Sequence, residues 1–311
     1  MTSKHFQNFI LAGPGKAGTT AIYFMLRQHP QIFLPDVKEP RFLAYENEPP
    51  QYTGPIIDKL FNDSTITNLE DYVKLYSNTG GAAAVGDASP IYMHIPRSVE
   101  TTMKYIPDAK IIILLRHPAE RAFSAYMHFV RDGYEKLSFR DSLLEEKERS
   151  SQNWGISWRY SQLGFIADQI ERYMNAFGRA QISFVRYEDF RRDNVQTLQR
   201  IFAFLGVAED FKPMLVNTNV GGVVKKLELY KLIFPIRFLR WLEPILPPKY
   251  RKVTTVWRLN MRSKTVIKPE LPLEQLQALT RMYEKDILRT ASLTGHDLSD
   301  WLNKNRKYNG E

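Results

Sequence analysis

Short apolar runs alternate with amphipathic segments along the first two thirds of the chain. The runs have the length of strands and cover residues 9–12, 82–85, 111–115 and 181–185. The amphipathic segments carry apolar side chains at helical spacing and cover residues 19–28, 98–105, 166–177 and 195–205. Strands that alternate with helices are typical of a parallel sheet with helices on both sides. The pattern therefore predicts an α/β fold with a central parallel sheet flanked by helices.

The run 111–115 gives the clearest strand. It is apolar throughout and is followed by Arg116, which is the pattern of a central parallel strand covered on both faces. Pro118 suits the first turn of a helix, and Glu120 would lie near the positive end of the helix dipole. Arg116 is thus predicted at the carboxyl end of a central strand, directly before a helix.

The remaining sequence is less regular. Residues 30–80 are rich in Pro, Asn, Asp and Tyr, and we predict loops with short helices near 58–61 and 69–76. We predict a single domain over residues 1–311, in which 221–311 form a mostly helical C-terminal extension. With 43% hydrophobic and 13% aromatic residues, the chain can bury a large core.

Charge and composition narrow the classes of function. The formal net charge of +9 favours anionic ligands, although the same charge would serve solubility alone. No basic motif of the RRM or KH type appears, so we expect no nucleic-acid partner. The chain has no cysteine, and therefore no disulfide, thiolate metal ligand or Cys nucleophile. Neither a signal-peptide pattern nor a spanning apolar segment is present, so we expect a cytoplasmic protein.

A glycine-rich turn joins the first predicted strand to the first predicted helix. A helix N-terminus offers unpaired N–H groups and partial positive charge, which suit a phosphate. Gly13 and Gly18 have the spacing of a nucleotide-triphosphatase loop, but Thr19 stands where that loop has lysine, and Lys16 lies inside the turn. The turn predicts phosphate binding with a differently placed ammonium group. The alternative is a structural turn with a solvated Lys16.

The strand before Arg116 argues against magnesium chemistry. In magnesium-dependent phosphoryl transfer, an apolar strand usually ends in an Asp that helps hold the metal. A cation at that place repels Mg²⁺ and attracts phosphate directly. The six histidines form no HExxH or paired-ligand spacing. We therefore expect no metal.

Arg116 and Ser124 form a second candidate phosphate site. Arg116 would stand at the sheet edge where ligands bind in open α/β folds, and Ser124 lies about two turns into the following helix. A guanidinium and a hydroxyl can hold one phosphate from two sides. Alternatively, Arg116 pairs with an acidic neighbour and Ser124 faces solvent.

Together these segments resemble a known family. Residues 13–20, with Leu26, His29-Pro30 and Lys38-Glu39-Pro40, resemble the 5′-phosphosulfate loop region of sulfotransferases that use 3′-phosphoadenosine-5′-phosphosulfate (PAPS). Residues 112–124 resemble their 3′-phosphate motif, and the likeness continues in 187–190, 204–206 and 293–301. It is weaker in 40–85 and 225–265. The likeness is greatest to the Golgi-type glycan branch, which includes the heparan sulfate sulfotransferases, and to its bacterial relatives.

The resemblance implies a P-loop-like sulfotransferase fold and metal-independent, in-line transfer of a sulfonate from PAPS to an acceptor hydroxyl or amine. Lys16 would stabilise the leaving phosphate, and Glu39 would be the catalytic base. The implied donor-binding residues are Gly15, Lys16, Ala17, Gly18, Thr19 and Thr20 at the 5′ end, Arg116 and Ser124 at the 3′ end, and Lys225 and Lys226 near the adenosine.

Alternatives for the base remain open. Glu39 could instead form a surface salt bridge with Lys38 or Arg41. Asp87 is the second candidate base and His94 the third, whereas His117 suits a helix cap or a packing role. One departure from the family is that Ala88 stands where several glycan-modifying members have a lysine, which puts one cationic contact in doubt.

The acceptor side is less defined. A carbohydrate or a related small or lipid-linked molecule is expected; Trp154, Trp158 and Tyr160 could stack on a sugar, although core packing is the commoner use. Residues 227–246 predict a basic amphipathic helix that could meet a membrane surface or an anionic acceptor, or simply pack on the core. Two other functions stay open: a nucleotide kinase or ATPase with a degenerate loop, and a non-catalytic binder of nucleotides or anionic glycans.

Overall fold

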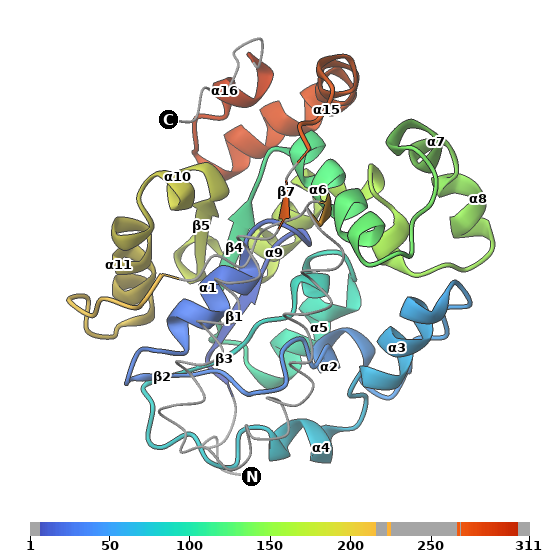
Figure 1. Ribbon diagram of the computed structural model, residues 1–311. Helices are drawn as coiled ribbons and strands as arrows, with labels where there is room; N and C mark the ends of the chain where they lie inside the picture. The colour runs from blue at the N-terminus through green and yellow to red at the C-terminus, as the bar shows by residue number, and fades with distance from the viewer. Residues whose placement is uncertain (1–6, 216–222, 225–265, 268, 304–311) are drawn as a thin grey trace.

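A five-stranded parallel sheet forms the centre of the computed structural model, which describes residues 7–215, 223–224, 266–267 and 269–303 (Figure 1). The strand order is β2-β3-β1-β4-β5. The strands are β1 (Phe9–Ala12), β2 (Ile32–Phe33), β3 (Ala84–Asp87), β4 (Lys110–Leu115) and β5 (Ile182–Arg186). All four pairings are parallel. The predicted α/β fold is confirmed.

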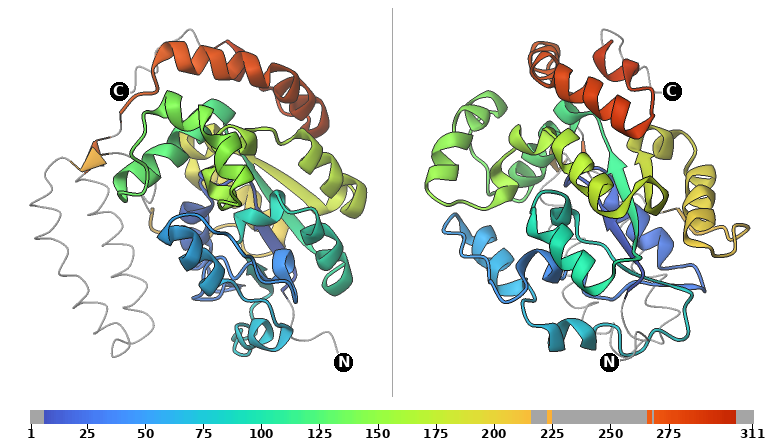
Figure 2. Two further views of the ribbon diagram at one scale, coloured as in Figure 1. Left: turned by 90° about the vertical axis from the view of Figure 1, so that its right-hand side faces the viewer. Right: turned by 180° about the vertical axis from the view of Figure 1, so that it is seen from behind.

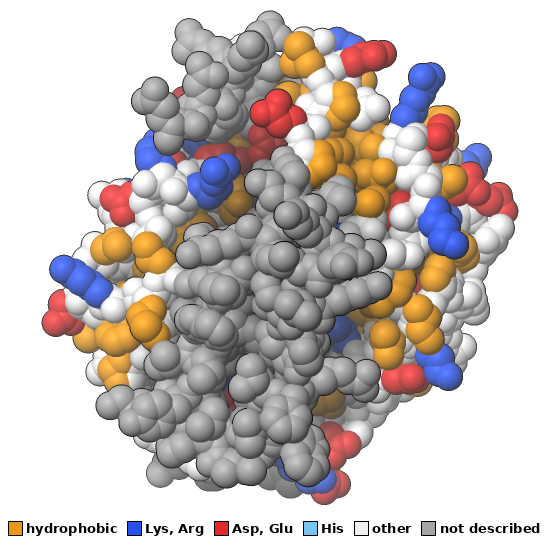
Figure 3. Space-filling model, in the orientation of Figure 1, with side chains coloured by type: hydrophobic (Ala, Val, Ile, Leu, Met, Phe, Trp, Pro, Cys, Tyr) orange, Lys and Arg blue, Asp and Glu red, His pale blue; other side chains and the backbone are white. Residues whose placement is uncertain are grey.

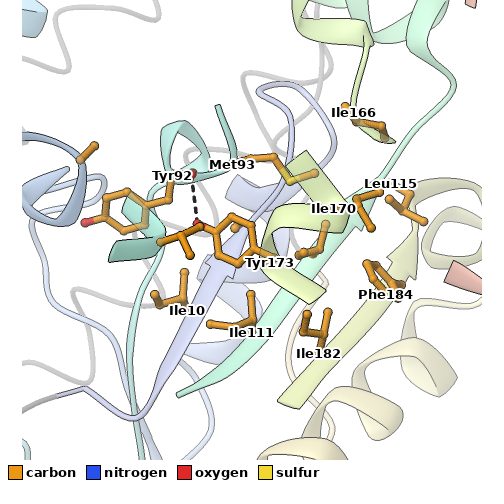
Figure 4. Packing of buried hydrophobic residues seen from close by; sticks show 14 of the residues in the cluster. Ile10, Tyr92, Met93, Ile111, Leu115, Ile166, Ile170, Tyr173, Ile182 and Phe184 are labelled. Atoms are coloured by element: carbon orange, nitrogen blue, oxygen red, sulfur yellow. Dashed lines mark hydrogen bonds between the residues drawn. The ribbon is translucent and has the colours of Figure 1, made fainter. Parts of the chain in front are cut away.

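Both faces of the sheet are buried. In β1, Ile10 belongs to one hydrophobic cluster and Leu11 to the other. Helices α5 (Arg97–Tyr105), α9 (Ala167–Phe177) and α15 (Leu273–Thr294) cover the first face, and α1 (Thr19–Leu26) and α11 (Asn194–Leu205) cover the second (Figure 2). On the first face, Tyr173 of α9 packs over the strands and its hydroxyl donates to the Tyr92 carbonyl at 3.0 Å (Figure 4).

Further elements surround this core. They are α2 (Phe42–Tyr45), α3 (Ile56–Ser64), α4 (Leu69–Lys74), α6 (Pro118–Arg131), α7 (Phe139–Leu144), α8 (Glu146–Ser151), α10 (Tyr187–Arg192) and α16 (Ser299–Leu302), with 3₁₀ turns η1 (Pro90–Met93), η2 (Ile156–Trp158), η3 (Gln162–Gly164) and η4 (Arg179–Gln181). Two further strands, β6 (Val223–Val224) and β7 (Val266–Ile267), pair antiparallel.

The structure differs from the sequence pattern in short elements. Strand β2 and helix α2 give no periodic signal, since two to four residues are too few to show one. The first helix ends at Leu26, two residues earlier than predicted. Pro30 limits how far the helix can extend, because a proline disfavours helical backbone at the residue before it.

The C-terminal region joins the same core. Leu279, Tyr283 and Ile287 of α15 belong to the cluster that also contains Ile111 and Ile113 of β4. The assignment of one domain to the whole chain stays a prediction, and residues 227–246 lie outside the described residues. No helix in the described ranges has the length and apolar character that a membrane crossing needs.

The turn after β1 gives a test of the fold. Gly13 has φ +136°, and a Cβ there would lie 2.8 Å from the Leu114 carbonyl oxygen. We expect Gly13→Ala to lower the free energy of unfolding by about 3 kcal/mol, because it adds a steric overlap to an unfavourable backbone conformation. Urea unfolding measures this loss. Gly133→Ala is the matched control, since Gly133 also has positive φ (+80°) but open space around its Cβ position; equal losses for the two variants would contradict the account.

Candidate active site

The carboxyl ends of the parallel strands bring the turn after β1 next to Arg116 and Tyr187. Lys16 has φ +72°, and Gly18, with φ +101°, is the residue before α1 and provides no side-chain cap. A Cβ on Gly18 would lie 3.0 Å from the Tyr187 ring, so the turn packs tightly on the start of α10. The first amides of a helix have no intrahelical acceptor. The turn therefore leaves an uncapped helix N-terminus at the sheet edge.

Arg116 fixes this turn to the sheet. Its side chain is only 3% exposed and donates a hydrogen bond to the Lys16 carbonyl at 2.6 Å. The guanidinium lies over the Tyr187 ring at 4.4 Å, and Glu120 is 4.0 Å away. Within the described residues, Arg116 Nε has no hydrogen-bond partner. Arg116 thus connects β4, the turn and α10 and keeps one donor unused.

A cavity of about 380 Å³ lies beside the turn. The predicted site residues in its wall are Gly15, Lys16, Gly18, Thr19, Thr20 and Glu39. The other predicted residues lie elsewhere: Ala17 is fully buried, Arg116 is buried and bonded to the turn, Ser124 is half-buried on α6, and Lys225 and Lys226 are outside the described residues. The structure therefore brings the predicted 5′ loop and the predicted base to one cavity.

Among the lysine and arginine side chains of this cavity, Lys16 has the largest shift in pKa. Burial, followed by the positive charges of Arg131, Arg116 and Lys38, lowers its pKa from 10.5 to about 7. A lysine in this state is only partly protonated at neutral pH. An anion bound nearby would raise the pKa again, because it removes the repulsion that the protonated form meets.

Glu39 enters the same cavity from a strained backbone position, with φ +60°. Its carboxylate pairs with Lys38 and has Oε2 3.9 Å from Arg41. Burial works to raise the pKa of Glu39, but Lys38, Arg41 and Lys16 outweigh it and hold this pKa below its usual range. Glu39 is therefore ionised at neutral pH. The salt bridge considered as the alternative role exists, and it coexists with a place in the cavity wall.

Asp87, the second candidate base, is held in the core. It is fully buried and accepts hydrogen bonds from Ser89 (2.7 Å), Tyr92 (2.6 Å) and Tyr72 (2.7 Å). Burial raises its pKa. Asp87 is not part of the cavity wall. It holds Ser89, whose Oγ accepts from the Arg41 amide at 3.3 Å.

The two candidate histidines have different positions: His117 caps a helix, and His94 lines the cavity. His117 caps α6 as expected: its Nδ1 accepts from the Ala119 amide at 3.2 Å, and its Nε2 donates to the Trp301 carbonyl at 3.0 Å. His94 lines the cavity, and its buried Nε2 has no partner among the described residues. Burial lowers the pKa of His94 from 6.5 to about 3, so the ring is neutral.

Sequence reasoning missed Arg121. It is 1% exposed, lines the cavity, and donates to the Gly15 carbonyl at 3.5 Å and to the Tyr160 carbonyl. Burial lowers its pKa to about 10. The available signal was helical spacing, since Arg121 follows Pro118, which is buried on α6, by three residues.

The aromatic side chains considered for sugar stacking mostly pack in the core. Trp158 is 1% exposed and Tyr160 is fully buried. Trp158 Nε1 donates to Asp58 at 3.1 Å. Core packing is the observed use of both. In the part of the chain that the structure describes, no three His, Cys, Asp or Glu side chains come together as a metal-binding group.

Comparison with known proteins identifies relatives of this arrangement. Residues 9–211 match the family model described as the Sulfotransferase family. A solved structure of a sulfotransferase from Alicyclobacillus acidocaldarius is 33% identical, covers 95% of this chain and 98% of its own, and has a TM-score of 0.76. That agreement indicates the same fold, as the sequence resemblance implied.

Curated relatives are similar over part of their length. Bifunctional heparan sulfate N-deacetylase/N-sulfotransferase 4 of Mus musculus is 25% identical over 220 residues, which cover 68% of this chain and 23% of that protein. Heparan sulfate glucosamine 3-O-sulfotransferase 3B1 of Mus musculus is 26% identical over 210 residues, 66% of this chain and 47% of that protein. The chain thus matches about a quarter of the first of these relatives and about half of the second.

The buried carboxylate of Asp87 gives a test of its structural role. We expect Asp87→Asn to lower the free energy of unfolding by about 2 kcal/mol, because an amide cannot accept from all three hydroxyl donors. Chemical denaturation measures the change. Asp108→Asn, at an exposed position, serves as the control and should leave stability within about 0.5 kcal/mol. A stability loss that is the same for both variants would contradict the structural role.

Proposed function

The chain belongs to the sulfotransferase family and is a sulfotransferase, and from this premise we propose that it transfers the sulfonate of PAPS to a hydroxyl or amine of a carbohydrate or another small or lipid-linked acceptor. The observation that carries the proposal is the shared cavity of Lys16, Glu39 and the uncapped N-terminus of α1. The N- and O-sulfotransferase names of two relatives support either acceptor atom.

The donor fits the cationic turn. In the proposal, the amides of Gly18, Thr19 and Thr20 bind the 5′-phosphate, as helix N-termini do. Arg116 and Ser124 bind the 3′-phosphate. The unpartnered Nε of Arg116 supports this, since a buried guanidinium donor without an acceptor favours an anionic ligand. The role of Lys225 and Lys226 toward the adenosine stays a prediction.

The chemistry needs one base and one cation. The acceptor oxygen or nitrogen forms a bond to sulfur while the bond from sulfur to the bridging phosphate oxygen breaks, and the acceptor proton passes to the Glu39 carboxylate. Lys16 neutralises the charge that grows on the departing phosphate. Glu39 is suited to its role because it is ionised and lies in the cavity. No metal is required in this scheme, and its absence from the reaction is part of the proposal.

Two substitutions test the roles of the base and the cation. We expect Lys16→Met to lower kcat by a factor of about 100 to 1000, because one stabilising contact to the leaving group is lost. Glu39→Gln should lower kcat by a factor of about 100 or more, because the amide cannot take the proton. Transfer of radiolabelled sulfonate from PAPS to a panel of glycan, phenol and lipid acceptors measures both.

Matched controls use exposed residues of the same kinds. Lys59→Met on α3 and Glu209→Gln, both exposed, should keep the wild-type rate. Full activity in both Lys16→Met and Glu39→Gln would overturn the site assignment. Binding of adenosine 3′,5′-bisphosphate (PAP) with no transfer by the wild-type protein to any acceptor would favour a non-catalytic binder.

The low pKa of Lys16 predicts proton uptake when the nucleotide binds. Below pH 7 the ammonium is already formed, whereas above pH 7 the free protein has lost this proton and must regain it to pair with phosphate. PAP affinity should therefore fall by up to about tenfold per pH unit from about pH 7.5 upward. Calorimetric titrations in buffers of different ionisation enthalpy measure the uptake directly. Lys16→Met should bind PAP more weakly and take up no such proton; the same uptake in both proteins would exclude Lys16 as its source.

A further inference from the structure

The cavity has a second end whose wall is mainly apolar. Away from the turn, its wall is formed by Ile57, Leu60 and Phe61 of α3, Ile91 of η1, Phe129 of α6 and Ile156 of η2. Leu60 is 50% exposed although its side chain is large and apolar. On the face shown in Figure 3, hydrophobic side chains gather on the side where Figure 1 places α3 and α6. This end suits an apolar ligand surface.

Two charged side chains, Asp58 and Arg41, lie among these apolar residues. Asp58 accepts from the Gly155 amide at 2.7 Å and from Trp158. Arg41 lies over the Phe61 ring at 4.2 Å and donates to the hydroxyls of Ser64 (3.0 Å) and Thr65 (3.3 Å), and its buried Nε has no partner among the described residues. A glycan charged along its whole length is disfavoured against Ile57, Leu60 and Phe61, because burying charges against apolar side chains is strongly unfavourable.

His94 supplies one uncharged polar contact in this wall. Its Nε2 is buried and has no partner in the described part of the chain. Because the ring stays neutral, it can share a hydrogen bond with a hydroxyl without introducing charge. A buried polar atom without a partner is costly unless a ligand satisfies it.

The size of the cavity limits the acceptor. Its volume of about 380 Å³ must hold the transferred group as well as part of the acceptor. Pockets of about 300 to 1000 Å³ enclose a single small molecule. A polysaccharide chain would have to lie largely outside such a site.

We propose that the acceptor is a small hydroxyl compound with an aromatic or alkyl body, which inserts between α3, η1 and α6 and hydrogen-bonds to His94 Nε2. This inference rests on the proposed sulfonate transfer and narrows its acceptor. It separates this chain from the relatives named for heparan sulfate, whose acceptor is a polyanionic polysaccharide.

A homologous acceptor series tests the apolar end directly. With PAPS as donor, we compare phenol with 4-propylphenol and 4-hexylphenol, methyl glucoside with hexyl glucoside, and both sets with a heparan-type oligosaccharide. The expected result is a rise in kcat/KM of about two- to fourfold for each methylene group until the cavity is filled. A flat series, or preference for the oligosaccharide, would overturn the inference while leaving sulfonate transfer intact.

Two variants test whether the acceptor binds at this end of the cavity. Leu60→Asp should lower kcat/KM for 4-hexylphenol by at least about tenfold and leave PAP affinity unchanged. Leu144→Asp, at a 73% exposed position on α7, should retain wild-type values. His94→Leu should raise the KM for the acceptor with unchanged PAP affinity. Wild-type KM in both Leu60→Asp and His94→Leu would contradict the assigned acceptor end, and absence of product with every acceptor would contradict the proposed function itself.

Discussion

The site depends on the hydrogen bond from Arg116 to the carbonyl of Lys16. Arg116 directly follows a central strand, so this bond and the stacking on Tyr187 fix the turn after β1 to the sheet and to α10. The turn can then keep the positive φ values of Lys16 and Gly18, which begin α1 with an uncapped N-terminus. A lysine at position 116 could not combine a planar stack with a directed hydrogen bond in this way.

Around this turn the protein gathers positive charge, with Glu39, Glu120 and Asp132 as acidic side chains near it. Burial and then the charges of Arg131, Arg116 and Lys38 lower the pKa of Lys16, while Lys38, Arg41 and Lys16 keep Glu39 ionised against the effect of its burial. Holding cations together under partial burial is unfavourable unless an anion joins them. The arrangement is therefore understandable as a preformed site for a phosphate-bearing donor, with the base in place beside it.

The sequence predicted those features that depend on consecutive residues. Apolar runs predicted β1, β4 and β5. The glycine-rich turn with Lys16 predicted the loop that we propose binds the donor, because the residues of that loop are consecutive. Arg116 pairs with its acidic neighbour Glu120, as one alternative had it, but its hydrogen bond to the Lys16 carbonyl could not be predicted, since that bond depends on the register of β1 and β4. Asp87 was a candidate base until the structure placed Tyr72 and Tyr92 beside it. The apolar end of the cavity comes from four segments far apart in the chain, so no single segment revealed it.

A crystal structure of the protein with bound PAP tests the central claim most directly. The account predicts the 5′-phosphate on the first amides of α1 and within hydrogen-bond distance of Lys16 Nζ, with the 3′-phosphate at Arg116 and Ser124. Nucleotide bound at another place, or phosphates that touch neither Lys16 nor Arg116, would contradict it.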